Sequence, residues 1–211
     1  MLPTTGSAYA DGASPSPTPS VVAPEDDSTL QTAPPPAPTE SGLVDVTDPN
    51  AEPTPTATQD PGMNHPGSQY CEEYGGKYRP TSKNGKYMRA VGPTQHNYNN
   101  TSRDMPMTFT ATASGTVGVT LSASGETSVS AMVAAQKVTY GMSLSTSLTA
   151  TLSNSVNPTA PPHTTISASY GVWREKITGV TYRLYSNCQQ SPYRTIVSYT
   201  PWYVGWYVWQ G

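Results

Sequence analysis

The chain has 211 residues, enough for one domain or two small ones, and a formal net charge of −3 at pH 7. The charge is unevenly spread: residues 11–60 carry nine of the fourteen acids and no Lys or Arg, while residues 61–211 carry all eleven basic side chains and five acids, a balance of 11 − 5 = +6. This modest excess argues against a nucleic-acid-binding protein.

The first ten residues carry two short signals. Residues 2–6, Leu-Pro-Thr-Thr-Gly, fit the LPxTG sorting pattern, but such signals act near a C-terminus. Ala8-Tyr9-Ala10 has the small-x-small pattern of a signal-peptidase site. We therefore expect residues 1–10 to be the remnant of a longer signal peptide and the protein to be secreted and extracellular. The alternative is a cytoplasmic protein with an accidental match.

The next segment, residues 11–62, is predicted to be a disordered linker. Residues 11–60 hold eleven Pro, thirteen Ser or Thr and no aromatic residue. Such a composition buries too little apolar surface to offset the entropy of ordering the chain. We expect an acidic, proline-rich leader, followed by a single β-rich domain over residues 63–211.

That domain opens with a basic, tyrosine-rich stretch over residues 70–104. Asn84-Gly85 lies there between short polar and aromatic runs, which predicts a hairpin turn. The two cysteines, Cys71 and Cys188, lie near the ends of the domain. In an exported chain we expect them to pair, closing a loop of 188 − 71 = 117 residues.

A long period-two pattern follows. From Met107 to Val133 the odd positions are mostly apolar or small and the even ones mostly Ser or Thr; from Val138 to Val156 the apolar positions are even. Period two predicts strands with one apolar and one hydroxyl face. Because the phase changes at residues 134–137, we expect a hairpin tip there. A helical insert over residues 130–137, SAMVAAQK, is the competing interpretation.

These long Ser/Thr-rich strands around an amphipathic hairpin resemble the aerolysin-type β-pore-forming family over residues 105–185. In that family the strands form an elongated sheet, and an inserted hairpin becomes part of a membrane barrel. The resemblance implies a membrane hairpin over residues 126–147, with each arm supplying the 9–11 residues that a spanning strand needs. The residues that it proposes for the membrane hairpin are Val129, Val133, Ala134, Ala135, Val138 and Leu144. A static β-sandwich with the apolar face as its own core is the alternative.

The last strand, residues 199–209, holds six aromatic residues in eleven positions. A strand here puts Trp202 and Trp206 on one face and Tyr203, Tyr207 and Trp209 on the other. These five form a candidate binding surface, because Tyr and Trp favour sugar rings and membrane boundaries. The alternative is a terminal strand buried between layers.

Catalytic motifs are missing from the sequence: the three histidines share no ligand spacing, and no nucleophile or phosphate-binding motif occurs. We therefore expect a protein that is not an enzyme, with no cofactor and no metal. The fold class is all-β, with an elongated or sandwich-like antiparallel sheet and a long Ser/Thr-rich hairpin. The expected function is that of a secreted, non-enzymatic β-protein acting at a cell surface or membrane, on lipid or a cell-surface glycan. The resemblance implies aerolysin-like pore formation and a homo-oligomer. The alternative is an extracellular or envelope-associated binding module that uses the Tyr/Trp surface.

Overall fold

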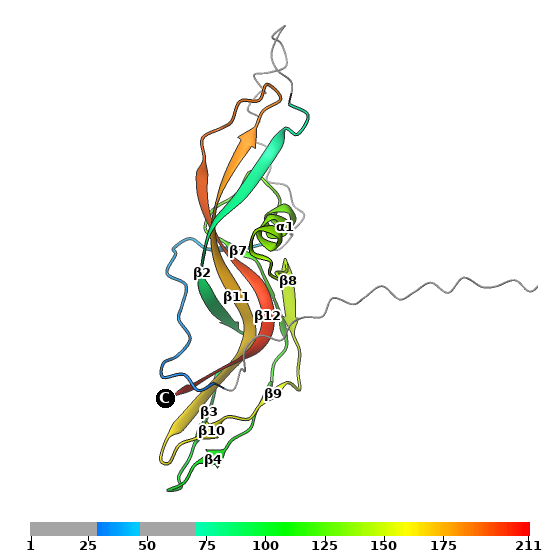
Figure 1. The fold of residues 1–211 in the computed structure, drawn as a ribbon. Helices are drawn as coiled ribbons and strands as arrows, with labels where there is room; N and C mark the ends of the chain where they lie inside the picture. The colour runs from blue at the N-terminus through cyan, green and yellow to red at the C-terminus, as the bar shows by residue number, and fades with distance from the viewer. Residues whose placement is uncertain (1–28, 47–70) are drawn as a thin grey trace, which may run out of the picture.

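A computed structural model describes residues 29–46 and 71–211 (Figure 1). The predicted signal-peptide remnant, residues 1–10, and the parts of the predicted linker before residue 29 and after residue 46 lie outside the described residues. The described chain is all-β with antiparallel pairing and one α-helix, so the predicted fold class is confirmed. The molecule is elongated along its longest strands, as Figure 1 shows.

Three long strands form the main sheet: β2 (Gly75–Ala90), β11 (Thr165–Leu184) and β12 (Arg194–Gln210). The central strand β11 pairs with β12 on one side, and with β2 and then β3 (Gln95–Tyr98) on the other. At about 3.3 Å per residue, the 20 residues of β11 extend roughly 65 Å. This strand therefore sets the length of the molecule.

The predicted hairpin turn at Asn84-Gly85 is wrong, because both residues lie inside β2. The pairing of β2 with β11 shifts there: Lys83 opposes Ile177 and Lys86 opposes Glu175, so two residues of β2 face one of β11. Gly85 has a φ of 100°, which glycine tolerates and a side chain does not. The same residue type that favours a tight turn here makes a β-bulge.

A second layer covers one face of this sheet. It consists of three short antiparallel pairs, and two hydrophobic cores fill the space between the layers. The pairs are β4 (Met105–Pro106) with β10 (Thr159–Ala160), β5 (Phe109–Thr110) with β9 (Ser155–Val156), and β6 (Gly115–Gly118) with β8 (Ser147–Ala150). We call these pairs the ladder. After β6 the chain enters β7 (Thr120–Leu121), which joins the edge of the main sheet beside β12.

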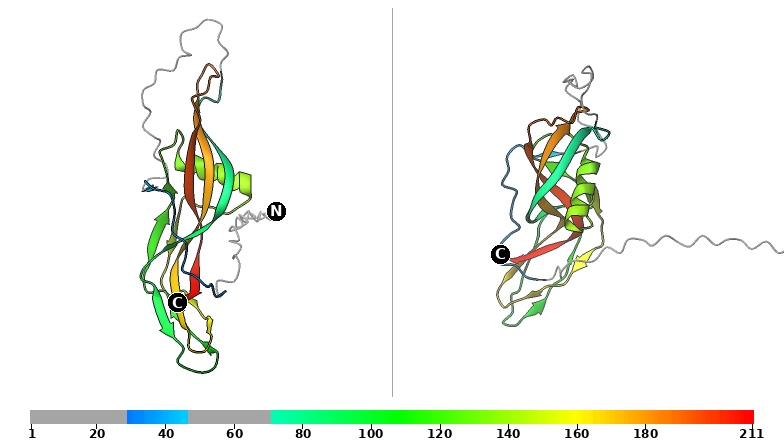
Figure 2. Two further views of the ribbon diagram at one scale, coloured as in Figure 1. Left: turned by 90° about the vertical axis from the view of Figure 1, so that its left-hand side faces the viewer. Right: turned by 45° about the horizontal axis from the view of Figure 1, so that its top comes forward.

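The predicted hairpin tip at residues 134–137 is also wrong, because helix α1 (Val129–Tyr140) occupies this segment. The Ser128 side chain accepts a hydrogen bond from the backbone of Ala131, and Gly141 ends the helix in the left-handed conformation. The helix crosses the long strands, as the left view of Figure 2 shows. Helix formers between two good caps therefore prevail over the period-two pattern.

Residues 29–46, predicted to belong to the disordered linker, lie against the main sheet, so the prediction is wrong for this part. We call this segment the strap; it is drawn in blue in Figure 1. Its last residues form β1 (Val44–Asp45), which pairs with β7 at the edge of the sheet. The prediction failed because the strap has no core of its own and is held by the surface of the domain.

The predicted disulfide is confirmed. Cys71 and Cys188 are bonded, with an S–S distance of 2.03 Å and a sequence separation of 117 residues. The bond joins the start of the domain to the loop between β11 and β12. It ties together one end of all three long strands.

Candidate functional site: a helix set into a β-hairpin

The three short pairs of the ladder share one register. The paired residues Met105 and Ala160, Thr110 and Ser155, and Gly118 and Ser147 all have residue numbers that add up to 265. Backbone hydrogen bonds continue the register between the strands: Met107 N to Pro158 O is 2.9 Å, Ala111 N to Asn154 O is 2.8 Å and Val119 N to Thr146 O is 3.1 Å. Residues 105–119 and 146–160 are therefore the arms of one antiparallel hairpin.

The two faces of the ladder have opposite character, as the period-two pattern predicts. Phe109, Val117 and Val156 are buried in the core that the ladder shares with the long strands. On the outer face the hydroxyls of Thr116 and Thr149 lie 2.8 Å apart, and Thr108 donates to Asn157 at 2.8 Å. The arms therefore expose a surface of hydroxyl and amide groups.

Between the arms, residues 120–145 do not continue the hairpin. We call these residues the insert; α1 forms its centre. The helix docks through Gln136, which is fully buried and donates to the Tyr78 hydroxyl at 3.0 Å and to the Ser198 hydroxyl at 2.8 Å. Thr200 donates back to the Gln136 amide oxygen at 2.8 Å. This polar network fixes the helix on β2 and β12.

The proposed membrane residues lie in three environments. Val129 and Val133 face inward from α1, and Leu144 follows the helix; all three are buried in the second core. Ala134 is exposed and Ala135 is half-buried. Val138 is 86% exposed, which is unusual for a large apolar side chain. The structure therefore does not gather these six residues on one face.

A carboxyl group lies beneath the end of α1, and the sequence analysis missed it. Glu175 on β11 is 1% exposed, and its Oε2 atom has no hydrogen-bond partner among the described residues. Burial raises the pKa of Glu175. Burial and the nearby Glu175 together raise the pKa of the Tyr140 phenol in the last turn of the helix. Period two along β11 was the available signal, because it puts Glu175 on the same face as the core residue Ile177.

The aromatic end strand has the two faces that its sequence predicts, and both are covered. Trp206 is 2% exposed in the first core, and its indole N–H donates to Asn154 at 2.9 Å. Trp202 is half-buried against the second core, with the Lys86 ammonium 5.0 Å from its ring centroid. On the opposite face Tyr203 and Trp209 are each 8% exposed and Tyr207 is half-buried. The five candidates therefore do not form one open platform.

Comparisons with protein-family models, with curated proteins and with solved structures find no match to this chain. Within residues 29–46 and 71–211, no helix is both long and apolar enough to cross a membrane. In the same described residues, no three His, Cys, Asp or Glu side chains gather into a metal site.

Proposed function

We propose that the protein is a secreted β-protein that acts on membranes by converting its insert from a docked helix into the distal half of the hairpin. The aerolysin-type family, which its sequence resembles, provides the precedent. The observation that carries this proposal is the single register of the ladder on both sides of the insert. The two arms are in register up to residues 119 and 146. The insert can therefore continue their pairing with no change of register.

Extending the same register through the insert separates most of its side chains by polarity. The exceptions are Thr127 and Gln136, which fall on the apolar side, and Met132 and Val133, which fall on the hydroxyl side at the tip. Pairs that again add up to 265 join Leu121 to Leu144 and Ala123 to Met142 on the apolar side. The insert has two charged residues, Glu126 and Lys137, and both fall on the hydroxyl side of the extended hairpin. This is the arrangement that a membrane hairpin needs, with one face toward lipid and the other toward water.

The insert also satisfies a helical pattern. The residues that α1 buries, Val129, Met132, Val133 and Gln136, have the spacing i, i+3, i+4, i+7. One sequence thus supports both a docked helix and an amphipathic hairpin. Each half of the insert also exceeds the 9–11 residues that a spanning strand requires.

Conversion has a definite structural requirement. In lipid every backbone N–H and C=O group of the hairpin must be paired between strands. A single hairpin leaves two open edges, so several copies must assemble side by side. The proposal therefore includes a homo-oligomer as the active state.

The test compares two lysine substitutions at adjacent exposed positions of α1. Val138 and Thr139 are both exposed in the resting fold, so Val138→Lys and Thr139→Lys should leave the melting temperature nearly unchanged. In the extended hairpin residue 138 faces lipid near the bilayer centre, where a lysine costs about 2–4 kcal/mol per copy, whereas residue 139 faces water. We expect Val138→Lys to abolish dye release from liposomes and Thr139→Lys to retain it.

Equal leakage by the two variants would contradict the proposed register. A wild-type protein that releases no dye from anionic, neutral or sterol-containing vesicles, and none from cells, would contradict membrane action itself. Aspartate at Val133 is a poorer test, because Val133 is 3% exposed and the substitution would disrupt the resting core.

A further inference from the structure

The face of the main sheet opposite α1 carries a row of aromatic rings. The rings of Trp173 and Tyr203 are stacked with centroids 5.7 Å apart, Tyr207 lies 5.7 Å from Trp173, and Trp209 lies 5.7 Å from Tyr207. A continuous line of ring faces and edges is the lining that extended proline-rich segments recognise. We call Trp173, Tyr203, Tyr207 and Trp209 the aromatic row.

A cluster of cations and tyrosines continues this row on the same face; we call it the cationic pocket, and its members are Arg174, Lys176, Tyr87 and Tyr199. The Lys176 ammonium lies 5.7 Å from the Tyr87 ring centroid and 6.0 Å from that of Tyr199, and the Arg174 guanidinium lies 5.2 Å from the Tyr199 centroid. Arg174 is 2% exposed and donates to Thr120 at 2.9 Å. The pocket therefore combines positive charge with a phenol donor, which suits a carboxylate.

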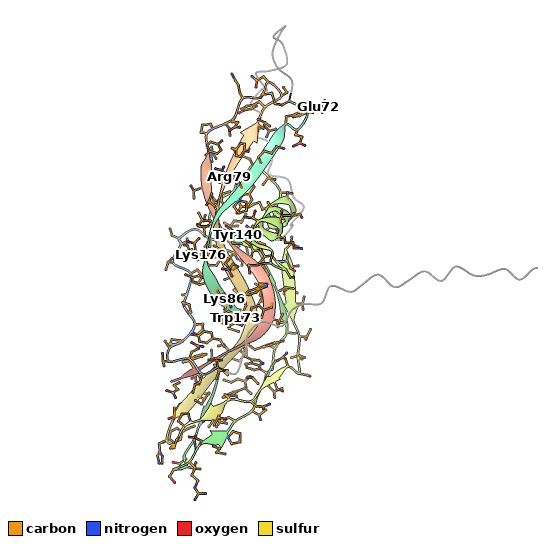
Figure 3. All side chains as sticks on the ribbon, viewed as in Figure 1. Glu72, Arg79, Lys86, Tyr140, Trp173 and Lys176 are labelled. Carbon is orange, nitrogen blue, oxygen red and sulfur yellow. A yellow bond between two sulfur atoms is a disulfide. The ribbon has the colours of Figure 1, made fainter. Side chains whose placement is uncertain are left out.

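The strap already occupies both features. Gln31 forms backbone hydrogen bonds of 2.9 Å with Val208 and Gln210 at the edge of β12, and the Tyr207 hydroxyl donates to the Ala33 carbonyl at 3.1 Å. Further along, the Glu40 carboxylate pairs with Lys176 and accepts a hydrogen bond from Tyr199. Figure 3 shows Lys176 on the side of the sheet along which the strap runs.

Between these anchors the strap has the features of a polyproline helix. Its sequence over residues 33–38 is APPPAP; Pro35 and Pro38 are half-buried, whereas Pro34, Pro36 and Ala37 are exposed. A repeat of three matches the three residues per turn of polyproline II. The seven steps between successive residues from Ala33 to Glu40 cover about 22 Å at 3.1 Å each, close to the roughly 26 Å of β12 from Tyr207 to Tyr199.

The strap contacts the cores only through partly buried side chains near its two ends, Leu30 at the first core and Val46 at the second. None of its residues falls in the fully buried class, and the indole N–H of Trp173 in the aromatic row has no hydrogen-bond partner among the described residues. A Trp donor in a proline-recognising groove ordinarily bonds a ligand carbonyl. The Trp173 indole can therefore donate to a ligand one hydrogen bond that the strap does not accept.

We propose that this face is a binding groove for extended proline-rich peptides of the pattern Pro-x-x-Pro-x-Glu, and that the strap is its occupant in cis. The prolines lie against the aromatic row and the glutamate enters the pocket of Lys176 and Tyr199. A second copy or another protein that presents this pattern competes with the strap for the same groove. Peptide binding in this groove does not require the proposed membrane activity, although β1 of the strap pairs with β7 of the insert.

The test uses the full chain with a specific protease site substituted for residues 54–60, so that cleavage leaves the strap non-covalently bound. A labelled peptide of residues 29–46 is added, and native mass spectrometry measures how much strap it replaces. We expect the wild-type peptide to exchange. A Pro35→Ala/Pro38→Ala peptide should need at least about a tenfold higher concentration to replace the same amount of strap, which corresponds to a loss of about 1.4 kcal/mol in binding free energy.

The matched control is a Pro34→Ala/Pro36→Ala peptide, which loses the same number of prolines from the exposed side and should exchange within about twofold of wild type. A Glu40→Gln peptide should be weakened about tenfold against wild-type protein. Against Lys176→Met protein, whose bound strap loses the same contact, the Glu40→Gln and wild-type peptides should exchange equally well. Equal exchange by the two proline variants would overturn the proposal. So would a cleaved strap that stays bound against about a thousandfold excess of wild-type peptide.

Discussion

Replacing Gln136 by Met removes the polar anchor of α1 while keeping an unbranched side chain of similar length. Gln136 is fully buried and takes part in three hydrogen bonds of 2.8–3.0 Å, with Tyr78, Ser198 and Thr200. A buried hydrogen bond contributes about 0.5–1.5 kcal/mol net, so three are worth roughly 1.5–4.5 kcal/mol. The expected loss in the free energy of unfolding lies in the lower half of that range, because the bonded partners of Gln136 keep other hydrogen bonds.

The groups that Gln136 leaves behind retain other partners. The Ser198 hydroxyl still donates to the Ile177 carbonyl at 3.2 Å, and the Thr200 hydroxyl has the Ser198 oxygen at 3.4 Å. The methionine also gains apolar burial. We therefore expect Gln136→Met to lower the free energy of unfolding by about 2 kcal/mol, which for a chain of this size is about 4–8 °C in melting temperature.

Urea unfolding of Gln136→Met and wild type measures this difference, with Ala131→Met as the control. Residue 131 lies on the exposed side of the same helix, so methionine there should change stability by less than about 0.5 kcal/mol. Amide exchange over residues 129–140 should accelerate in Gln136→Met if the helix undocks before the sheet unfolds. Unchanged stability together with unchanged exchange would refute the anchoring role of Gln136.

Three further outcomes are expected. Glu175→Gln should stabilise the protein by about 1–3 kcal/mol at pH 8. Because burial raises the folded-state pKa of Glu175 above 4.5, this gain should shrink as the pH falls toward 4.5 and be lost below about 4, where the carboxyl is protonated in both states. Thermal melts that show the same gain at pH 8 and pH 4 would contradict it. Burial alone raises the pKa of Glu40, but hydrogen bonds from Lys176 and Tyr199 outweigh it and lower the pKa from 4.5 to about 2. Stability from this contact is therefore present above about pH 4.5 and lost as the pH falls toward 2. The rate at which pepsin cuts the strap should rise in wild type as the pH falls across that window, whereas Glu40→Gln should be cut readily throughout it. Cys188→Ser should lower stability by up to about 5 kcal/mol, because the bond closes a 117-residue loop, and melting temperatures under non-reducing conditions that match wild type would argue against it.

Local sequence determined the strands and the disulfide of this protein. Period two predicts which residues of the ladder face the core, and Phe109, Val117 and Val156 are buried as expected. In the last strand the same rule separates Trp206, in the core, from Tyr207, on the opposite face. The two cysteines at the ends of the domain were enough to predict their pairing. These properties depend on alternation and composition, which a sequence carries by itself.

The tertiary structure decided the features on which function depends. The segment around residues 129–140 satisfies both a strand and a helix pattern, and docking of Gln136 on β2 and β12, together with the caps at Ser128 and Gly141, selects the helix. Asn84-Gly85 becomes a bulge because β11 supplies partners on both sides of it. The strap, too polar to fold alone, is ordered by aromatic rings and cations from distant strands. In each case the local sequence permits more than one conformation, and contacts made only in the folded domain select one of them.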